Sequence, residues 1–207
     1  MEKRENNIFL SGVLTEGLLI LVALGLAWFG LYDHRQPLSE IQWAELVSSV
    51  WIGLVATIPI GLLMWIVMIL PFEWVREFNL LVDRQVAPLF RDITIPEIFA
   101  LSLMAGLGEE ILFRWAIQGG LETLLLGSAG SILAAGVAVL IASVLFGLCH
   151  ALSTTYVVLT IVIGVYFGLL MNYTGSWIVP AVSHFVYDFF AILVISRRKR
   201  LISPDNF

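Results

Sequence analysis

Three ionisable residues, Glu109, Glu110 and Arg114, lie within residues 98–117, a stretch that is otherwise apolar or small. Ionisable groups at membrane depth are costly, and they indicate a functional site by default. Glu110 and Arg114 are four residues apart with the acid first, which favours an ion pair along one helix. Glu109 points about 100° away from that pair. A carboxylate without a nearby cation in a low-dielectric setting is suited to act as a general base.

Two glycines precede the acids. Gly106 and Gly108 carry no side chains, so another helix can approach this face of the expected helix closely. A plainer interpretation of the charges stays open: a buried structural pair, beside an acid that snorkels or stays protonated. That interpretation explains Glu110 and Arg114 but leaves Glu109 unexplained.

Three further polar residues are expected at membrane depth. His184 and Asp188 share one face of a helix, so the carboxylate can accept a hydrogen bond from the ring and fix its tautomer. Such a pair can equally join two helices. His150 ends another apolar run, where a histidine is more often a satisfied interface residue. Together with Glu109, these groups lie on three helices without a local countercharge, and convergence on one polar pocket satisfies them all.

A pocket with a carboxylate and two imidazoles is suited to hydrolysis. Glu109, helped by His150, can take a proton from water, and His184 can stabilise the oxyanion that develops. The same groups, with Asp188, are acceptable zinc ligands. The sequence contains no His-Glu-x-x-His motif, so we expect no cofactor, and a divalent metal such as zinc stays an unsupported alternative.

Two other residue types that serve as nucleophiles are weaker candidates. Cys149 adjoins His150, but adjacent residues of a helix do not face each other. Ser128 lies in an expected connection, where no histidine is clearly paired with it.

The composition predicts a membrane protein. The 207 residues are 59% hydrophobic and only 13% charged, and the mean hydropathy is +0.95. A soluble core could not bury so much apolar surface, so we expect an all-α polytopic bundle forming one domain over residues 1–207. The formal charge of −5 argues against nucleic acid as a partner. The expected partners are the lipid bilayer and a membrane-associated peptide or protein.

Hydropathy indicates six spans and one interfacial helix. The expected spans cover residues 8–32, 46–70, 97–118, 131–150, 154–173 and 177–195. Residues 71–96 show aromatic and aliphatic residues at helical spacing among charges, which predicts an amphipathic helix in the interface. Residues 119–130 are punctuated by glycine and are expected to form a connection that dips into the membrane at residues 124–126.

The basic residues indicate an orientation. With the N-terminus inside, the outer connections hold only Arg35, which predicts a multi-pass protein of the plasma (cell inner) membrane with both termini cytoplasmic. At about 1.5 Å per residue, Glu109 and His184 then lie roughly 12–14 Å below the outer face. His150 falls near the opposite face by the same count, unless its helix starts deeper or is strongly tilted.

Three motifs in order resemble the CPBP family of membrane proteases, which includes the type II CAAX prenyl proteases and the bacteriocin-processing ABI proteins. The motifs are Glu109-Glu110-x-x-x-Arg114, Phe146-x-x-x-His150 and His184-x-x-x-Asp188. The similar region covers residues 97–195, with motif helices at 97–118, 131–150 and 177–195. The resemblance implies an intramembrane endopeptidase acting on membrane-associated or lipidated substrates.

The resemblance also implies a role for each motif residue. Glu109 would be the general base, assisted by His150, and His184 would belong to the oxyanion site. Glu110 and Arg114, with Phe146, would support the site or the substrate. The third motif of the family often ends in Asn, whereas this chain has Asp188. An ionised Asp cannot donate to an oxyanion, so it would orient His184 instead or favour a metal.

Two other functional classes remain open from the sequence. A non-catalytic scaffold or immunity protein could keep the polar cluster for folding. A proton-coupled carrier is the other, although no repeated half and no pair of broken helices is visible.

Overall fold

The computed structural model describes residues 2–129 and 131–197, and every element in them is helical. The side chain of Ser128 and the basic residues 198–200 lie outside this description. The elements in chain order are α1 (Glu2–Trp28), η1 (Leu38–Glu40), α2 (Trp43–Ile69), α3 (Glu73–Leu81), η2 (Val82–Val86), η3 (Ala87–Phe90), α4 (Ile95–Glu110), η4 (Ile111–Gln118), α5 (Gly119–Ala129), α6 (Ser131–Cys149), α7 (Thr154–Thr174) and α8 (Ile178–Ser196). The all-α class is confirmed.

Five helices of the described chain are long and apolar enough to cross a membrane: α1 from Ile8, α2, α6, α7 and α8. The sixth expected span, over residues 97–118, is part of a longer helical rod formed by α4, η4 and α5. The middle section, η4, is π-helical, a form that recurs at functional sites.

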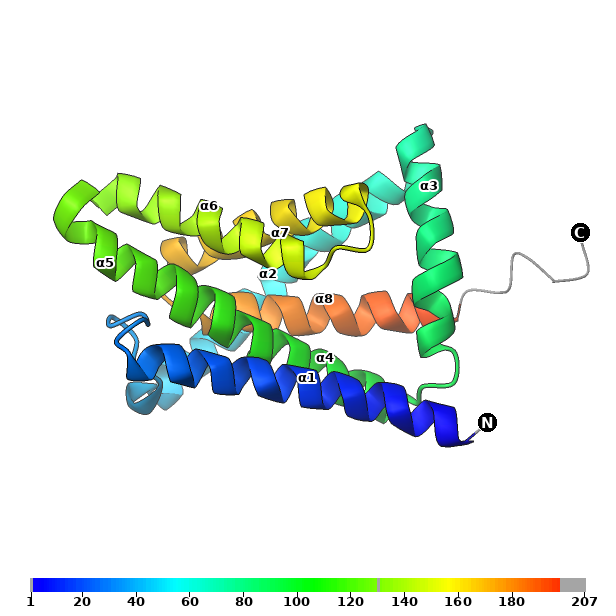
Figure 1. Cartoon of the computed structure of the whole chain (residues 1–207), viewed down its shortest axis with the longest axis horizontal. Coiled ribbons are helices and arrows are strands. Elements are labelled where there is room, and N and C mark those ends of the chain that lie inside the picture. The colour runs from blue at the N-terminus through cyan, green and yellow to red at the C-terminus, as the bar shows by residue number, and fades with distance from the viewer. Residues whose placement is uncertain (1, 130, 198–207) are drawn as a thin grey trace, which may run out of the picture.

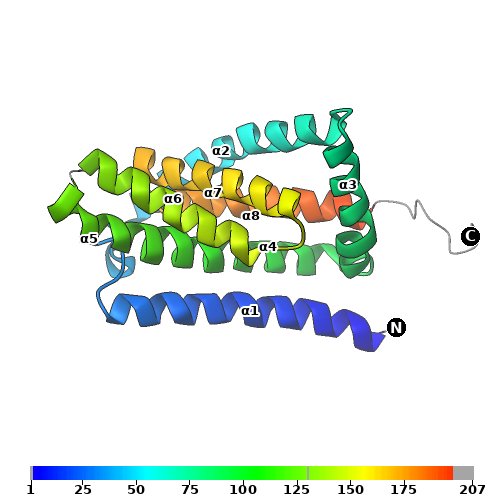
Figure 2. The ribbon, with the colours of Figure 1, turned by 45° about the horizontal axis from the view of Figure 1, so that its top comes forward.

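The rod and α8 lie at the centre of the bundle. α8 packs against α4 on one side and α2 on the other, while α1 covers α4 and η4 from outside. The short helix α3 lies steeply across one end of the bundle, as Figures 1 and 2 show. Its charged and apolar residues face different sides, and Val75 and Phe78 are buried. The amphipathic helix expected within residues 71–96 is therefore present at an end of the spanning helices, where an interfacial helix belongs.

Aromatic side chains are exposed near both ends of the long helices. Trp28, Trp43 and Tyr173 are exposed at the end opposite α3, and Trp65 and Trp74 are exposed at the α3 end. Tryptophan and tyrosine concentrate at both membrane–water interfaces. The long axis of the bundle therefore follows the membrane normal.

Residues 119–129 form a helix, so the prediction that this glycine-rich segment is a connection between spans is wrong. The glycines serve close packing and not a turn: a Cβ at Gly119 would lie 2.4 Å from Cβ of Asp33, and one at Gly120 would lie 2.6 Å from Leu31. The segment between α1 and α2 thus rests directly on the rod backbone. Glycine marks a close backbone approach as readily as it marks a loop.

The continuous rod also places His150 level with Glu109. From Glu109 the chain runs about 20 residues to the end of α5, and α6 then returns over about the same number, so both legs are roughly 30 Å long. Figure 1 shows α5 and α6 as a hairpin at the end opposite α3. The sequence predicted different depths for His150 and Glu109 because it ended the third span at residue 118, whereas the helical rod continues to Ala129.

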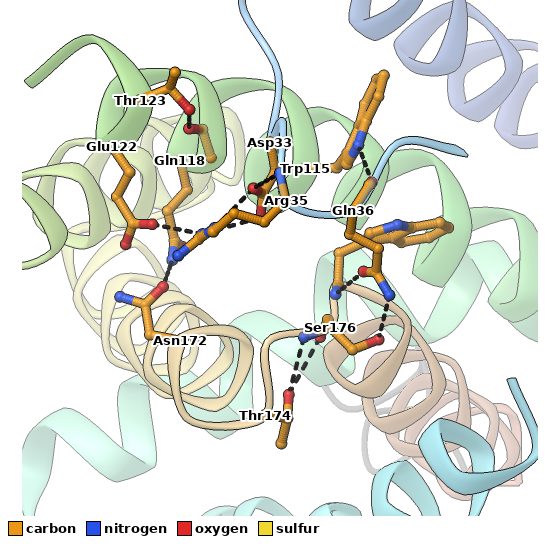
Figure 3. A network of polar contacts seen from close by, with 12 residues as sticks. Asp33, Arg35, Gln36, Trp115, Gln118, Glu122, Thr123, Asn172, Thr174 and Ser176 are labelled. Carbon is orange, nitrogen blue, oxygen red and sulfur yellow. Dashed lines mark hydrogen bonds and ion pairs between the residues drawn. The ribbon is translucent and has the colours of Figure 1, made fainter. Parts of the chain in front are cut away.

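A polar network fixes the α1–α2 connection to the rod at this end (Figure 3). Arg35 forms ion pairs with Asp33, at 2.8 Å, and with Glu122 of α5. The backbone N–H of Asp33 donates to the Trp115 carbonyl at 2.8 Å. Hydrogen bonding to Asp33 and the charges of both acids raise the pKa of Arg35, so the guanidinium stays cationic.

Gln36 extends the network to α8. Its carbonyl accepts from Trp115 Nε1 at 2.9 Å, and its Oε1 accepts from the Trp177 N–H at 3.1 Å. Its Nε2 donates to Ser176 Oγ at 3.3 Å. Gln36 therefore joins the rod through its backbone and the segment that begins α8 through its side chain, which holds the two motif helices in register.

The two glycines before Glu109 allow two helices to approach, as their lack of side chains predicts. A Cβ at Gly106 would lie 2.7 Å from the Ala181 carbonyl and 2.8 Å from the Phe185 nitrogen of α8, and Gly108 faces Glu16 of α1. Backbone atoms cannot move aside as flexible side chains can.

We expect Gly106→Ala to destabilise the fold by about 1–3 kcal/mol, because the added methyl group forces α4 and α8 apart. Activity should fall with stability, since that contact sets the distance between Glu109 and His184. Thermal unfolding in detergent measures the effect. Gly136→Ala on α6 is the matched control, because its Cβ would meet nothing within 4 Å. Equal stability of the two variants would contradict this account of the contact.

Candidate active site

The ion pair Glu110–Arg114 forms the buried floor of the site. Arg114 Nε donates to Glu110 Oε2 at 2.7 Å, and both side chains are 0% exposed. The guanidinium carbon lies 5.2 Å from the centroid of the Phe146 ring and 6.0 Å from that of Phe167. Arg114 Nη1 and Nη2 are buried without hydrogen-bond partners, so the two aromatic faces are their principal compensation.

His184 is held by Glu110, an interaction that the sequence did not indicate. His184 Nδ1 donates to Glu110 Oε1 at 3.0 Å, and the Phe167 ring stacks on the imidazole at 5.1 Å. Asp188, expected to accept from the ring, lies 3.4 Å from Nε2, so each ring nitrogen of His184 faces a carboxylate. Glu110 therefore determines the ring orientation, and Asp188 faces the nitrogen that points into the site.

Glu109 lies between the two imidazoles. Its Oε1 is 3.7 Å from His150 Nε2, and its Oε2 is 4.0 Å from His184 Nε2. Oε2 is buried and has no hydrogen-bond partner. The Arg114 pair is with Glu110, so the neighbouring acid keeps its carboxyl free, as the helical spacing predicts.

The tautomer of neutral His150 follows from its backbone contact. Nδ1 lies 2.8 Å from the Phe146 carbonyl, and because a carbonyl only accepts, Nδ1 carries the proton. Neutral His150 therefore turns the lone pair of Nε2 towards Glu109. Phe146 contributes twice, since its ring also packs edge-on to His184 at 6.0 Å.

A cavity of about 500 Å³ adjoins these groups. It is lined by His150, His184 and Asp188 together with mostly apolar side chains of α2, α7, α8 and the α3–η3 segment, among which are two threonines and two tyrosines. The side chains of His150 and Asp188 are each 27% exposed, whereas His184 is 7% exposed. The charged and imidazole groups that face the cavity thus adjoin a chamber whose other lining is mostly apolar.

Glu16 on α1 is a neighbour of the site that the motifs did not identify. It is the single charged residue within the apolar segment Ile8–Trp28. A Cβ at Gly108 would lie 3.0 Å from Glu16 Oε2, which is buried without a hydrogen-bond partner. The carboxyl interacts electrostatically with His184 and Asp188. A single charged residue within a spanning segment indicates a functional position, so Glu16 could have been identified from the sequence.

Glu109, His150, His184 and Asp188 are the four candidate metal ligands. Within residues 2–129 and 131–197, no group of three or more His, Cys, Asp or Glu side chains is arranged to hold a metal ion. The Nδ1 atoms of His150 and His184 are engaged by Phe146 and Glu110. The two Nε2 atoms remain available, each within 4.0 Å of a Glu109 oxygen, and Asp188 lies 3.4 Å from that of His184.

Residues 91–190 match the Rce1-like family, described as type II CAAX prenyl endopeptidase Rce1-like. The matched segment runs from the residue after η3 into α8 and contains all three motifs, whereas Glu16 lies outside it. The match confirms the resemblance that those motifs predict, and it indicates a membrane protease at the level of the family. No curated protein and no solved structure matches the chain.

Proposed function

Because residues 91–190 match a family of CAAX-type proteases, we propose that this chain hydrolyses peptide bonds with a water molecule activated by Glu109 and His150. The observation that carries the proposal is the position of Glu109 between two imidazoles, with one carboxyl oxygen unpartnered. At 3.7 Å, Glu109 and His150 are too far apart for a direct hydrogen bond. Both can therefore bond to one water between them.

The proposed reaction uses the side chains in sequence. Water attacks the carbonyl carbon while its proton passes to Glu109, and the carbonyl electrons move to the oxygen. His184 acts as an imidazolium, protonated on both ring nitrogens: Nδ1–H donates to the ionised Glu110, and Nε2–H donates to the oxyanion. When the tetrahedral intermediate collapses, the C–N bond breaks and the leaving amine takes the proton from Glu109.

The proposed substrates are membrane-associated or lipidated peptides. The apolar walls of the cavity suit a hydrophobic side chain or a lipid beside the scissile bond. A library of membrane peptides incubated with the purified protein tests the proposal directly. A matched pair of peptides ending in Cys, two aliphatic residues and a final residue, with and without a farnesyl group, tests lipid dependence. No turnover of any peptide would favour a non-catalytic scaffold or immunity protein.

We place the α3 end of the bundle on the cytoplasmic side of the plasma (cell inner) membrane. Arg76, Arg84, Arg91 and Arg197 lie in segments at this end, where α1 begins and α8 ends, and Arg35 lies at the opposite end. This distribution supports cytoplasmic termini. The cavity is lined by residues of the α3–η3 segment, so a substrate would enter from the cytoplasmic half of the bilayer.

Asp188→Asn distinguishes water activation by side chains from a metal. We expect chelators to leave turnover intact and the variant to stay active, because Asn keeps a carbonyl oxygen for His184 and adds an N–H donor. Elemental analysis of the purified protein accompanies the assay. A chelator-sensitive enzyme whose Asp188→Asn variant loses zinc and activity together would overturn the metal-free mechanism.

A further inference from the structure

An oxyanion in this site has few donors available. His184 offers only Nε2, because Nδ1 is bonded to Glu110. Neutral His150 turns a lone pair into the site, and an ionised Asp188 cannot donate. Arg114 is sealed behind aromatic rings and does not line the cavity. Effective oxyanion sites present fixed donors to the oxygen, and a single imidazole leaves room for another.

Most other donors that line the cavity are already used. The Thr57 hydroxyl donates to the Gly53 carbonyl at 3.0 Å, and the Thr160 hydroxyl donates to the Tyr156 carbonyl at 2.8 Å. Trp65 is largely exposed on α2. Among the described residues around the cavity, the phenol hydroxyls of Tyr156 and Tyr187 remain.

The position of Tyr156 favours it over Tyr187. Its ring lies nearly parallel to that of His150, with planes at 11° and centroids 6.5 Å apart. Its hydroxyl interacts electrostatically with both Glu109 and Asp188, and that of Tyr187 interacts with Asp188. Tyr156 therefore lines the cavity beside His150, on the side of the site where water would be activated.

The backbone and the ring of Tyr156 are both fixed. Ser153 caps α7, and its hydroxyl accepts from the Tyr156 N–H at 3.1 Å. Only the short connection after His150 separates the two residues, and the Leu152 N–H donates to the His150 carbonyl at 2.8 Å. Phe78 of α3 packs against the Tyr156 ring at 5.8 Å. A donor held in this way needs little reorganisation during reaction.

We propose that the Tyr156 hydroxyl is a second oxyanion donor, acting beside His184 Nε2; this assignment rests on the proposed hydrolytic function. The phenol proton stays on Tyr156 throughout, and no bond to it breaks. The hydrogen bond strengthens as charge develops on the carbonyl oxygen, so it stabilises the transition state more than the bound substrate.

The test compares Tyr156→Phe with the wild type on the peptide that the wild type cleaves fastest. The variant keeps the ring contacts with His150 and Phe78 and loses only the hydroxyl. We expect kcat to fall on the order of 10²-fold with KM unchanged. Affinity for the corresponding peptide phosphonate, which imitates the tetrahedral oxyanion, should fall by a similar factor.

Tyr166→Phe is the matched control on the same helix. The Tyr166 hydroxyl donates to the Ala56 carbonyl at 2.6 Å, and the residue does not line the cavity. This variant should lose thermal stability while kcat stays within about twofold of the wild type. Tyr166→Phe therefore measures the effect of removing a tyrosine hydroxyl that has only a structural role.

Each outcome decides the proposal. An unchanged kcat in Tyr156→Phe overturns it while leaving the protease intact, as does a loss confined to Tyr187→Phe. A rise in KM alone would make Tyr156 a substrate contact and overturn the oxyanion role. A wild type without turnover removes the hydrolytic function and this assignment together.

Discussion

Glu109→Gln should reduce peptide hydrolysis by about 10²–10⁴-fold, the contribution typical of a general base. The amide has the shape of the carboxyl but cannot take a proton from water. Folding should be little affected, because Glu109 Oε2 has no hydrogen-bond partner to lose. Turnover of membrane peptides by the purified variant, beside its elution profile, gives the measurement.

Cys149→Ser is the control for that experiment. Cys149 is an exposed free thiol directly before His150, and it should be replaceable without loss of turnover. Retained hydrolysis in Glu109→Gln would remove Glu109 as the base. Loss of hydrolysis in Cys149→Ser alone would redirect the mechanism to the thiol.

Glu110→Gln should destabilise the protein by about 3–5 kcal/mol, far more than Glu109→Gln, because it leaves a fully buried Arg114 without its counter-ion. The Gln oxygen can still accept from His184 Nδ1, but its amide group then turns a donor towards Arg114. Thermal unfolding in detergent compares the two single variants. Equal or reversed shifts would mean that the roles of the two acids have been exchanged.

Replacing both partners tests whether that loss comes from the unpaired charge. Glu110→Leu with Arg114→Met should recover part of the stability lost in Glu110→Gln, since apolar replacement of a buried pair is often close to neutral. The double variant should remain inactive, because His184 has lost the acceptor of its Nδ1–H. Stability below that of the single variant would contradict the explanation by an unpaired charge.

Local spacing made part of the site predictable. Glu110 and Arg114 are one helical turn apart, so their pairing required no knowledge of the tertiary fold. The same holds for the proximity of His184 and Asp188. The bond between Glu110 and His184 joins residues 74 apart in the chain, and only the packing of α4 on α8 reveals it.

Other features depend on information that a single sequence lacks. Gly119 and Gly120 have the composition of a turn, and nothing local shows that another segment of the chain rests on their backbone. The hydropathy of α1 predicted a span, but not that its one acid would lie against Gly108. The expected depth of His150 failed for the same reason, because an incorrect helix end displaced the next helix by several turns.

The central rod has a consequence for how the protein is made. With Glu109, Glu110 and Arg114 within a few residues, it is the helix least able to enter a bilayer alone, because each charge near a helix centre opposes insertion by about 2.5–3.5 kcal/mol. α1 precedes it during synthesis and can receive it, whereas α8, which brings His184 and Asp188, is made only after α5, α6 and α7. The proposed catalytic site can therefore form only after α8 has entered the membrane.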